Sequence, residues 1–188
     1  MKRAFDSLTP SLIAQRKTVH EVCRLFSKSP SKGNLKRLKS FLGQCGEHVY
    51  IESGFHCDYA ENIYLGDRVY INSHCTLIDS NKINNSQQDE SLADVGAITI
   101  GDDCLIGPNV QLLAVSHDMN PTQRRQFKHN YAQGITLENN VWLGAGVIVL
   151  AGVTIGENSV IGAGSVVTKS VEKNSFYAGN PAIKVRDL

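Results

Sequence analysis

The chain has no excess of charge of either sign. Its 188 residues carry 19 Lys and Arg against 18 Asp and Glu, a formal net charge of +1 at pH 7. This balance gives no electrostatic reason to expect nucleic acid or an anionic membrane as a partner. Any anionic ligand must therefore be held by a local group of basic side chains.

Long apolar runs and paired cysteines are also missing. No apolar run reaches the ~20 residues of a membrane span, and the start MKRAFDSLTP is not followed by an apolar signal segment. The five cysteines are odd in number and form no Cys-x-x-Cys pair, which argues against a disulfide framework or a zinc knuckle. We therefore expect one soluble, cytoplasmic domain whose cysteines are small core residues.

A period of six runs through most of the sequence. Aliphatic residues recur at steps of six within three groups, glycine often follows them, and the residue four places later is small or β-branched. The aliphatic positions are Leu65, Ile71, Leu77, Ile100, Ile106, Leu112, Leu137, Leu143, Val149, Ile155, Ile161 and Val167. The following glycines are Gly66, Gly101, Gly107, Gly144, Gly156 and Gly162.

A period of six matches neither the 3.6 residues of a helical turn nor the alternation of a single strand. A coil of three short parallel strands explains it. One aliphatic residue per hexad points inward, the residue four later fills the corner, and glycine supplies the positive φ of a tight turn. We predict an all-β fold, a parallel β-helix over residues 47–174.

Two long loops interrupt the repeat, at residues 78–97 and 118–135. Each gap in the repeat equals one hexad plus the extra residues of a loop. Both loops therefore leave the prism after the third strand of a coil, at the same corner of two successive coils. His117 is the last residue before the second loop. We therefore expect His117 at the root of one loop, with the other loop above it.

The ends of the chain do not follow the repeat. Residues 1–46 predict a helical arm, with Thr9 as N-cap and Pro10 at the first helical position, and with Leu12, Val19, Cys23 and Phe26 on one face. The stretch NLKRLKSFLG predicts a second helix that ends at Gly43. Ile51, Cys57 and Ile63 are out of step with Leu65, which indicates an irregular opening coil. Residues 175–188 contain no hexad and predict a tail.

The segments FHCDYAENIYLGDRVYINSHCTLID, IGPNVQLLAVSH and IGAGSVVTKSV resemble, in order, those of hexapeptide-repeat acyltransferases, and most closely the galactoside and maltose O-acetyltransferase group. The resemblance covers nearly the whole chain. It implies a left-handed β-helix, and this handedness rests on the resemblance alone, because general topology rules favour right-handed crossovers. It also implies a homotrimer with active sites between subunits, acetyl-CoA as co-substrate and no required metal.

His117 matches the catalytic histidine of this group. A sugar hydroxyl is a poor nucleophile at neutral pH, so acetyl transfer needs a base that takes its proton as it attacks the thioester. The reference pKa of imidazole, about 6.5, leaves the ring largely neutral at pH 7, so it can accept this proton. The alternative is a histidine that only caps a loop by hydrogen bonding.

Asp58 and Asn72 match acceptor-binding positions of the group. Asp6 lies near the place where the group has an aspartate that reaches the acceptor, and Asp79 stands where relatives have one or two acidic residues. The alternative for Asp58 and Asn72 is a turn hydrogen bond. Ser80 stands where relatives often have a second aspartate. The insertion SNKINNSQQDESLADVGA is longer than the link in those relatives, and we expect it either to line the acceptor pocket or to be a disordered polar loop.

The group's acetyl-CoA contacts match Ala145, Ala163, Thr168, Lys169, Lys184 and Arg186. Small residues let the pantetheine arm approach the backbone, and the basic side chains can meet phosphates. Trp142, the single tryptophan, fits either a cofactor contact or a subunit contact.

Other functions leave different sequence traces. Zinc-dependent γ-class carbonic anhydrases share the prism but need a close histidine pair, whereas His117 and His129 are twelve residues apart. Serine acetyltransferases have a longer helical amino-terminal domain. Streptogramin-type antibiotic acetyltransferases remain the main alternative, and a non-catalytic scaffold would leave His117 and the basic tail without a role. The sequence does not identify the acceptor.

Overall fold

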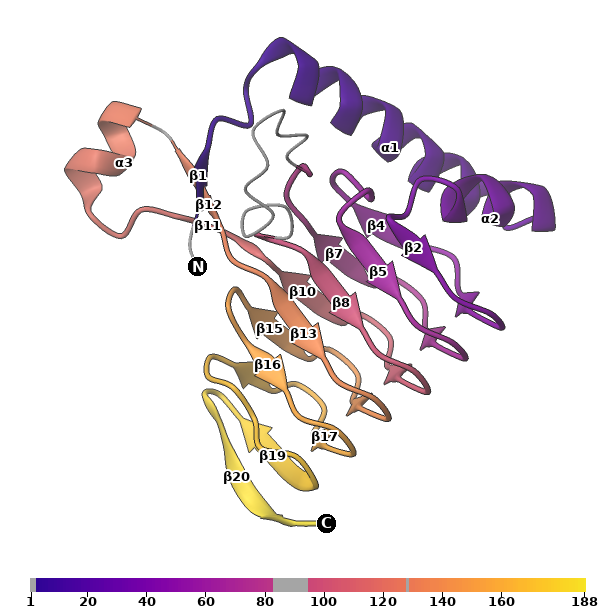
Figure 1. The fold of residues 1–188 in the computed structure, drawn as a ribbon, viewed down its shortest axis with the longest axis vertical. Helices are drawn as coiled ribbons and strands as arrows, with labels where there is room; N and C mark the ends of the chain where they lie inside the picture. The colour runs from indigo at the N-terminus through magenta and orange to yellow at the C-terminus, as the bar shows by residue number, and fades with distance from the viewer. Residues whose placement is uncertain (1–2, 83–94, 128) are drawn as a thin grey trace, which may run out of the picture.

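The computed structural model describes residues 3–82, 95–127 and 129–188. Its main body is a prism of stacked coils with three parallel sheets as faces (Figure 1). Successive strands of the chain pass from one face to the next, and each pairs with the strand that lies one coil further along. The predicted parallel β-helix is therefore present, with helices at its amino-terminal end.

Each face is a ladder of two- or three-residue strands, except for the longer last two strands of the second face. The first face runs from β2 (Gln44–Cys45) through β5 (Ile63–Leu65), β8 (Ile98–Ile100) and β13 (Ile135–Leu137) to β16 (Thr154–Ile155). The second comprises β3 (Tyr50–Ile51), β6 (Tyr70–Ile71), β9 (Leu105–Ile106), β14 (Trp142–Leu143), β17 (Val160–Ile161), β19 (Ser175–Gly179) and β20 (Ala182–Asp187). The third comprises β4 (His56–Cys57), β7 (Thr76–Ile78), β10 (Gln111–Leu113), β15 (Ile148–Leu150) and β18 (Val166–Val167).

The aliphatic residues of the hexads form the core, as the period predicts. Leu65, Ile100, Leu137 and Ile155 are paired in successive strands, and each is at most 1% exposed. Burying such side chains stabilises the fold by roughly 1.5–3 kcal/mol each. Every coil therefore adds an apolar layer to one continuous core.

The prediction that the glycines after the aliphatic residues supply positive φ is wrong. Most corners take their positive φ from other residues, such as Asp103, Asn140 and Asn158, with φ between 56° and 60°. Gly144 is instead required by space, because a Cβ there would lie 2.6 Å from the backbone nitrogen of Ala163 in the next coil. Asn and Asp tolerate the left-handed conformation through local side-chain hydrogen bonds.

The amino-terminal helices cover the first coil (Figure 1). Helix α1 (Pro10–Lys28) has Thr9 as N-cap, as predicted, and buries Val19, Val22, Cys23 and Phe26. Helix α2 (Lys32–Lys39) is capped by Ser31, whose hydroxyl accepts a hydrogen bond from the backbone N–H of Asn34, and it ends four residues before the predicted end at Gly43.

The opening coil departs from the period of six at one corner, as predicted, although its strands are in register with the next coil. Cys45, Ile51 and Cys57 pair in register with Leu65, Ile71 and Leu77 of the second coil. The apparent shift arises because the corner after Cys57 is two residues longer than the hexad allows. The repeat therefore begins at β2, within the predicted arm.

The carboxyl end also differs from the predicted tail. Strand β19 pairs with β17 in parallel, and β20 folds back on β19 in the antiparallel direction. This pair, named here the C-terminal hairpin, extends the second face and covers the end of the stack. No helix within the described ranges is both long and apolar enough to cross a membrane.

Candidate active site

His117 ends a strand that leaves the prism. Strand β11 (Val115–His117) follows β10 at the corner and pairs with β12 (Asn130–Ala132), while β1 (Arg3–Phe5) pairs with the other side of β12. Helix α3 (Pro121–Phe127) lies at the tip of this loop (Figure 1). The predicted place of His117, at the root of an excursion after a third strand, is confirmed.

The two loops meet at β1. The guanidinium of Arg3 donates to the hydroxyl of Ser80 at 3.1 Å and to the carbonyl of Asn81 at 2.9 Å, where the first loop begins. The amide of Asn130 in the second loop donates to the hydroxyl of Ser7 at 2.6 Å. The predicted role of the insertion falls largely on residues 83–94, which lie outside the described residues.

The side chain of His117 faces a hollow of about 330 Å³ that Ser7, Leu8, Arg124 and Asn130 also line. His117 is exposed, and within the described residues its imidazole makes no hydrogen bond. Arg124 donates to the carbonyl of Asp118 at 2.8 Å and so holds the start of the loop. The imidazole is thus free to accept a proton from a bound molecule.

A second and larger hollow lies along the second face. This hollow, named here the donor groove, has a volume of about 610 Å³ and follows the corners between β6, β9, β14, β17 and the C-terminal hairpin. Four of the seven residues predicted to contact acetyl-CoA line it, namely Trp142, Ala145, Ala163 and Arg186, and Asn72 lines it too. Phe176 and Pro108 are lining residues that the sequence did not reveal.

The other predicted acetyl-CoA residues lie outside the donor groove. Thr168 and Lys169 are exposed at the corner after β18. The ammonium of Lys184 lies 2.7 Å from carboxylate oxygens of both Glu172 and Asp187, and these hydrogen bonds raise the pKa of Lys184. A phosphate would have to compete with two carboxylates for this side chain.

The predicted acceptor residues do not form one cluster. Asp6 is exposed and accepts a hydrogen bond from the backbone N–H of Leu8 at 2.9 Å, so it lies beside the hollow of His117. The carboxamide oxygen of Asn72 accepts from the backbone N–H of Ser73 at 2.8 Å. The Asn72 bond is local, as the alternative interpretation of that residue expects, and the Asp6 bond reaches two residues on, as in an Asx turn.

Asp79 is fully buried rather than exposed to an acceptor. One carboxylate oxygen accepts from the backbone N–H of Tyr59 at 2.9 Å, and the other has no hydrogen-bond partner among the described residues. Burial raises the pKa of Asp79 to about 7, although the backbone N–H groups of Tyr59 and Ala60 act in the opposite direction. Asp79 holds the long corner of the opening coil.

Asp58 belongs to a group that the sequence did not predict. Its carboxylate lies 3.0 Å from Nε2 of His20 in α1, and the ring of His20 lies 4.5 Å from that of His56, between centroids. Burial lowers the pKa of His56, and the neighbouring His20 lowers it further. His20 and His56 are 36 residues apart and belong to a helix and a strand, so no local spacing relates them.

Comparison with known proteins identifies the family. The model "Bacterial transferase hexapeptide (six repeats)" matches residues 134–169, and "Hexapeptide repeat of succinyl-transferase" matches residues 97–112. The galactoside O-acetyltransferase of Lactococcus lactis is 35% identical over 155 residues, which are 82% of this chain and 67% of that protein.

Two solved structures share the fold over almost the whole chain. A galactoside acetyltransferase in complex with coenzyme A is 33% identical, with a TM-score of 0.85, and the match covers 98% of this chain and 86% of that one. A hexapeptide-repeat-containing acetyltransferase of Vibrio cholerae, complexed with acetyl coenzyme A, is 29% identical with a TM-score of 0.83, and the match covers 98% and 92% of the two chains. The chain therefore belongs to the hexapeptide-repeat acyltransferases, in the group of the galactoside and maltose O-acetyltransferases.

Proposed function

We propose that this protein transfers an acetyl group from acetyl-CoA to a hydroxyl of a sugar or related acceptor, with His117 as general base. The observation that carries the proposal is the donor groove, because it gathers Trp142, Ala145, Ala163 and Arg186 on one surface. The coenzyme A and acetyl coenzyme A complexes of the two related structures support the choice of donor. We also propose that the β-helix is left-handed, as in the group that the sequence resembles.

The donor groove suits a long, partly apolar cofactor. Its volume of about 610 Å³ lies within the usual range of small-molecule sites, roughly 300–1,000 Å³. Ala145 and Ala163 are exposed at neighbouring corners, so a pantetheine chain can reach backbone amides there. The guanidinium of Arg186, on β20, supplies the local positive charge that a phosphate requires in a chain of net charge +1.

The proposed reaction is direct transfer in a ternary complex. Nε2 or Nδ1 of His117 accepts the proton of the acceptor hydroxyl while the hydroxyl oxygen attacks the thioester carbon. The tetrahedral intermediate then collapses, the C–S bond breaks, and the proton passes from the imidazolium to the leaving thiolate. The imidazole returns to its neutral form, so one acetyl group moves per cycle with no other reagent.

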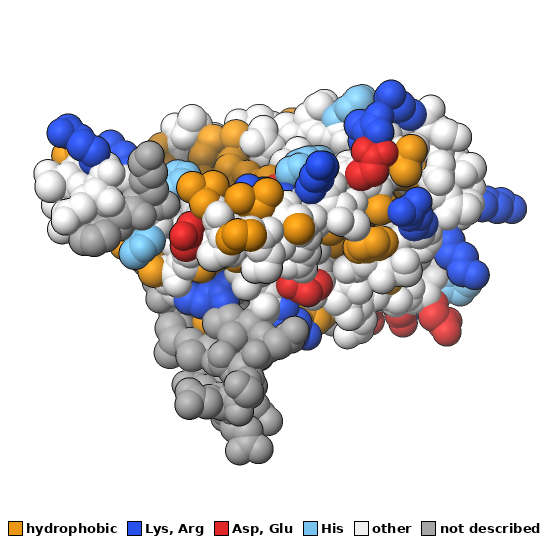
Figure 2. Space-filling view, turned by 90° about the horizontal axis from the view of Figure 1, so that it is seen from above, with side chains coloured by type: hydrophobic (Ala, Val, Ile, Leu, Met, Phe, Trp, Pro, Cys, Tyr) orange, Lys and Arg blue, Asp and Glu red, His pale blue; other side chains and the backbone are white. Residues whose placement is uncertain are grey.

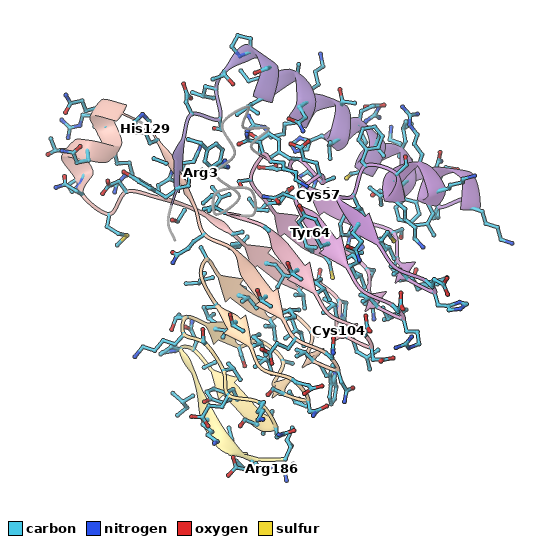
Figure 3. The ribbon with its side chains drawn as sticks, viewed as in Figure 1. Arg3, Cys57, Tyr64, Cys104, His129 and Arg186 are labelled. Atoms are coloured by element: carbon cyan, nitrogen blue, oxygen red, sulfur yellow. The ribbon has the colours of Figure 1, made fainter. Side chains whose placement is uncertain are left out.

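One chain does not complete the site. The hollow of His117 and the donor groove share no lining residue. Figure 3 places His129, in the loop that begins after His117, and Arg186, in the C-terminal hairpin, at opposite ends of the molecule. A neighbouring subunit that presents its donor groove to this His117 would complete the machinery.

The second face offers a surface for that neighbour. Outward side chains form an apolar row across it, and Tyr50, Leu105 and Trp142 are each at least 50% exposed. In register with them are Tyr70, Val160 and Phe176. A row of this kind is larger than the scattered apolar residues of ordinary surfaces, so we propose a homotrimer with three sites between subunits.

The first test replaces His117 by Ala and measures thiol release from acetyl-CoA with galactosides, maltose and a streptogramin. The base contributes about 10²–10⁴ in rate, so kcat should fall by that factor while the Kd for acetyl-CoA stays unchanged. His48→Asn removes an exposed histidine from an unrelated corner and serves as the control. Undiminished transfer by a folded His117→Ala protein would refute the proposal.

A mixing experiment tests the shared site. His117→Ala removes the base, and Ala163→Trp fills the donor groove, so each variant alone should have little activity at an acetyl-CoA concentration below the wild-type KM. If base and groove come from different chains, refolding the two together in equal amounts should restore about one quarter of the wild-type activity, since half the bases meet half the grooves in a closed ring. No recovery in mixed trimers would show that each chain builds its own site.

A further inference from the structure

Three potential metal ligands converge where α1 crosses the opening coil. His20 comes from α1, His56 from β4 and Asp58 from the long corner that follows. One ligand atom from each lies within 4.8 Å of the others, and Nε2 of His20 is 3.0 Å from Oδ1 of Asp58. Among the described residues this is the one such group of three or more side chains.

We propose that His20, His56 and Asp58 bind a divalent transition-metal ion such as Zn²⁺. Two imidazoles and one carboxylate form a donor set that suits zinc and leaves one position for water. His20 lies on α1, whereas His56 and Asp58 belong to the opening coil, so a bound ion links the helical arm to the prism. The site is separate from the acetyl transfer chemistry at His117.

The spacing of the ligand atoms is close to that of a four-coordinate site. Bonds of about 2.0–2.1 Å at tetrahedral angles place ligand atoms ~3.4 Å apart. The pair formed by His20 and Asp58, at 3.0 Å, already meets this spacing. The separations that involve His56 are no greater than 4.8 Å, and rotation of the partly exposed rings can bring these atoms to the required spacing.

The site is open to solvent. The side chains of His20 and Asp58 are 39% and 21% exposed. In the view from the α1 end, histidine side chains lie at the surface beside Lys and Arg side chains (Figure 2). An ion can therefore enter, and a water can fill the fourth position, without opening the core.

Neighbouring cations oppose a divalent ion, but two of them are held by other groups. The guanidinium of Arg24 forms an ion pair with Glu21, and that of Arg16 donates to the hydroxyl of Tyr59 at 3.3 Å. Lys17 lines the same shallow hollow as His20. The negative charge of Asp58 is in direct contact with the site, whereas these charges lie on the helix surface, so the carboxylate dominates.

Binding is measured directly, on the full-length protein freed of metal with a chelator. Titration calorimetry with Zn²⁺, and absorption after addition of Co²⁺, should show one ion per chain. His20→Asn, His56→Asn and Asp58→Asn should each weaken Zn²⁺ binding at least tenfold, and His48→Asn should leave it unchanged. Saturating Zn²⁺ should raise the Tm of the wild-type protein and of His48→Asn but not that of the three site variants, because binding to the folded state alone stabilises it.

Circular dichroism identifies variants that do not fold, and the site variants that do fold then test the proposed zinc site. Binding of less than one ion per chain, equal affinity in the wild type and in folded site variants, or an equal loss in His48→Asn would each overturn the proposal. Acetyl transfer by the metal-free enzyme should be unchanged. A loss of activity on chelation that Zn²⁺ restores would overturn the separation of this site from catalysis.

Discussion

The buried carboxyl group of Asp79 predicts an unusual dependence of stability on pH. Burial raises the pKa of Asp79 from 3.8 to about 7, so the folded state binds the proton more tightly than the unfolded state does. Stability from this group is therefore complete below pH 3.8 and is lost as pH rises through 7. Replacing Asp79 by Asn removes the titration and keeps nearly the same shape.

The size of the effect follows from the two pKa values. Between pH 5 and pH 8 the linkage relation gives a loss of about 2.5 kcal/mol in the wild type that the Asn variant does not share. The amide nitrogen of the variant lacks an acceptor, because one oxygen of Asp79 has no hydrogen-bond partner among the described residues, and this costs roughly 1–3 kcal/mol at every pH. Whatever the size of this cost, we expect the stability of Asp79→Asn relative to the wild type to improve by about 2.5 kcal/mol between pH 5 and pH 8.

Urea unfolding at a fixed protein concentration, followed by circular dichroism at pH 5 and pH 8, measures the difference between the two proteins. Comparing variants at each pH cancels the titration of all other carboxyl groups. Asp103→Asn is a matched control, because the Arg68 guanidinium lowers the pKa of that exposed carboxyl, which therefore stays ionised between pH 5 and pH 8, and the free-energy difference from the wild type should be the same at both pH values. If the free-energy difference between Asp79→Asn and the wild type is the same at both pH values, the carboxyl titrates normally and the reasoning fails.

Two further predictions concern the donor groove. Ala163→Trp should raise KM for acetyl-CoA at least tenfold, a loss of about 1.4 kcal/mol in binding, with an elution volume in size-exclusion chromatography equal to that of the wild type. Ala163→Ser, which keeps the space, should behave as the wild type. Arg186→Ala should raise KM for acetyl-CoA with little change in kcat, whereas Lys184→Ala should change KM less, because Glu172 and Asp187 already hold that ammonium. Equal effects of the last two substitutions in steady-state kinetics would contradict this assignment.

The sequence predicts the prism well because one physical constraint acts on every coil. An inward position such as Leu143 must be apolar in each turn of the stack, so the constraint repeats at a fixed interval. The same regularity predicts the corner where His117 leaves, since any excursion has to rejoin the next coil in phase. The resemblance to the family also predicts acetyl-CoA contacts at Ala145, Ala163 and Arg186, and the structure brings these three residues together in the donor groove.

Other features leave no periodic signal. The contact between His20 and Asp58 joins a helix to a corner 38 residues away, and it depends on how α1 crosses the coil. The C-terminal hairpin has five- and six-residue strands in which β20 runs antiparallel to β19, so a search for hexads cannot detect it. The positive φ at Asn140 and Asn158 follows from turn geometry that several residue types can adopt.

Function in this fold is concentrated where the repeat is broken. A regular coil satisfies its backbone hydrogen bonds with the coils on either side and turns its aliphatic side chains inward. It therefore presents few polar groups that could bind or react with a ligand. The longer corner after Cys57 gives Asp58 room to meet His20, the excursion after β10 brings His117 to the surface, and the C-terminal hairpin adds Arg186 to one wall of the donor groove. Because the core layers above and below remain in register, such departures change the surface without disturbing the stack. The same reasoning explains how a rigid repeat can carry different acceptor sites: variation at the corners costs little stability, whereas a one-residue shift within a strand would turn its buried side chain outward.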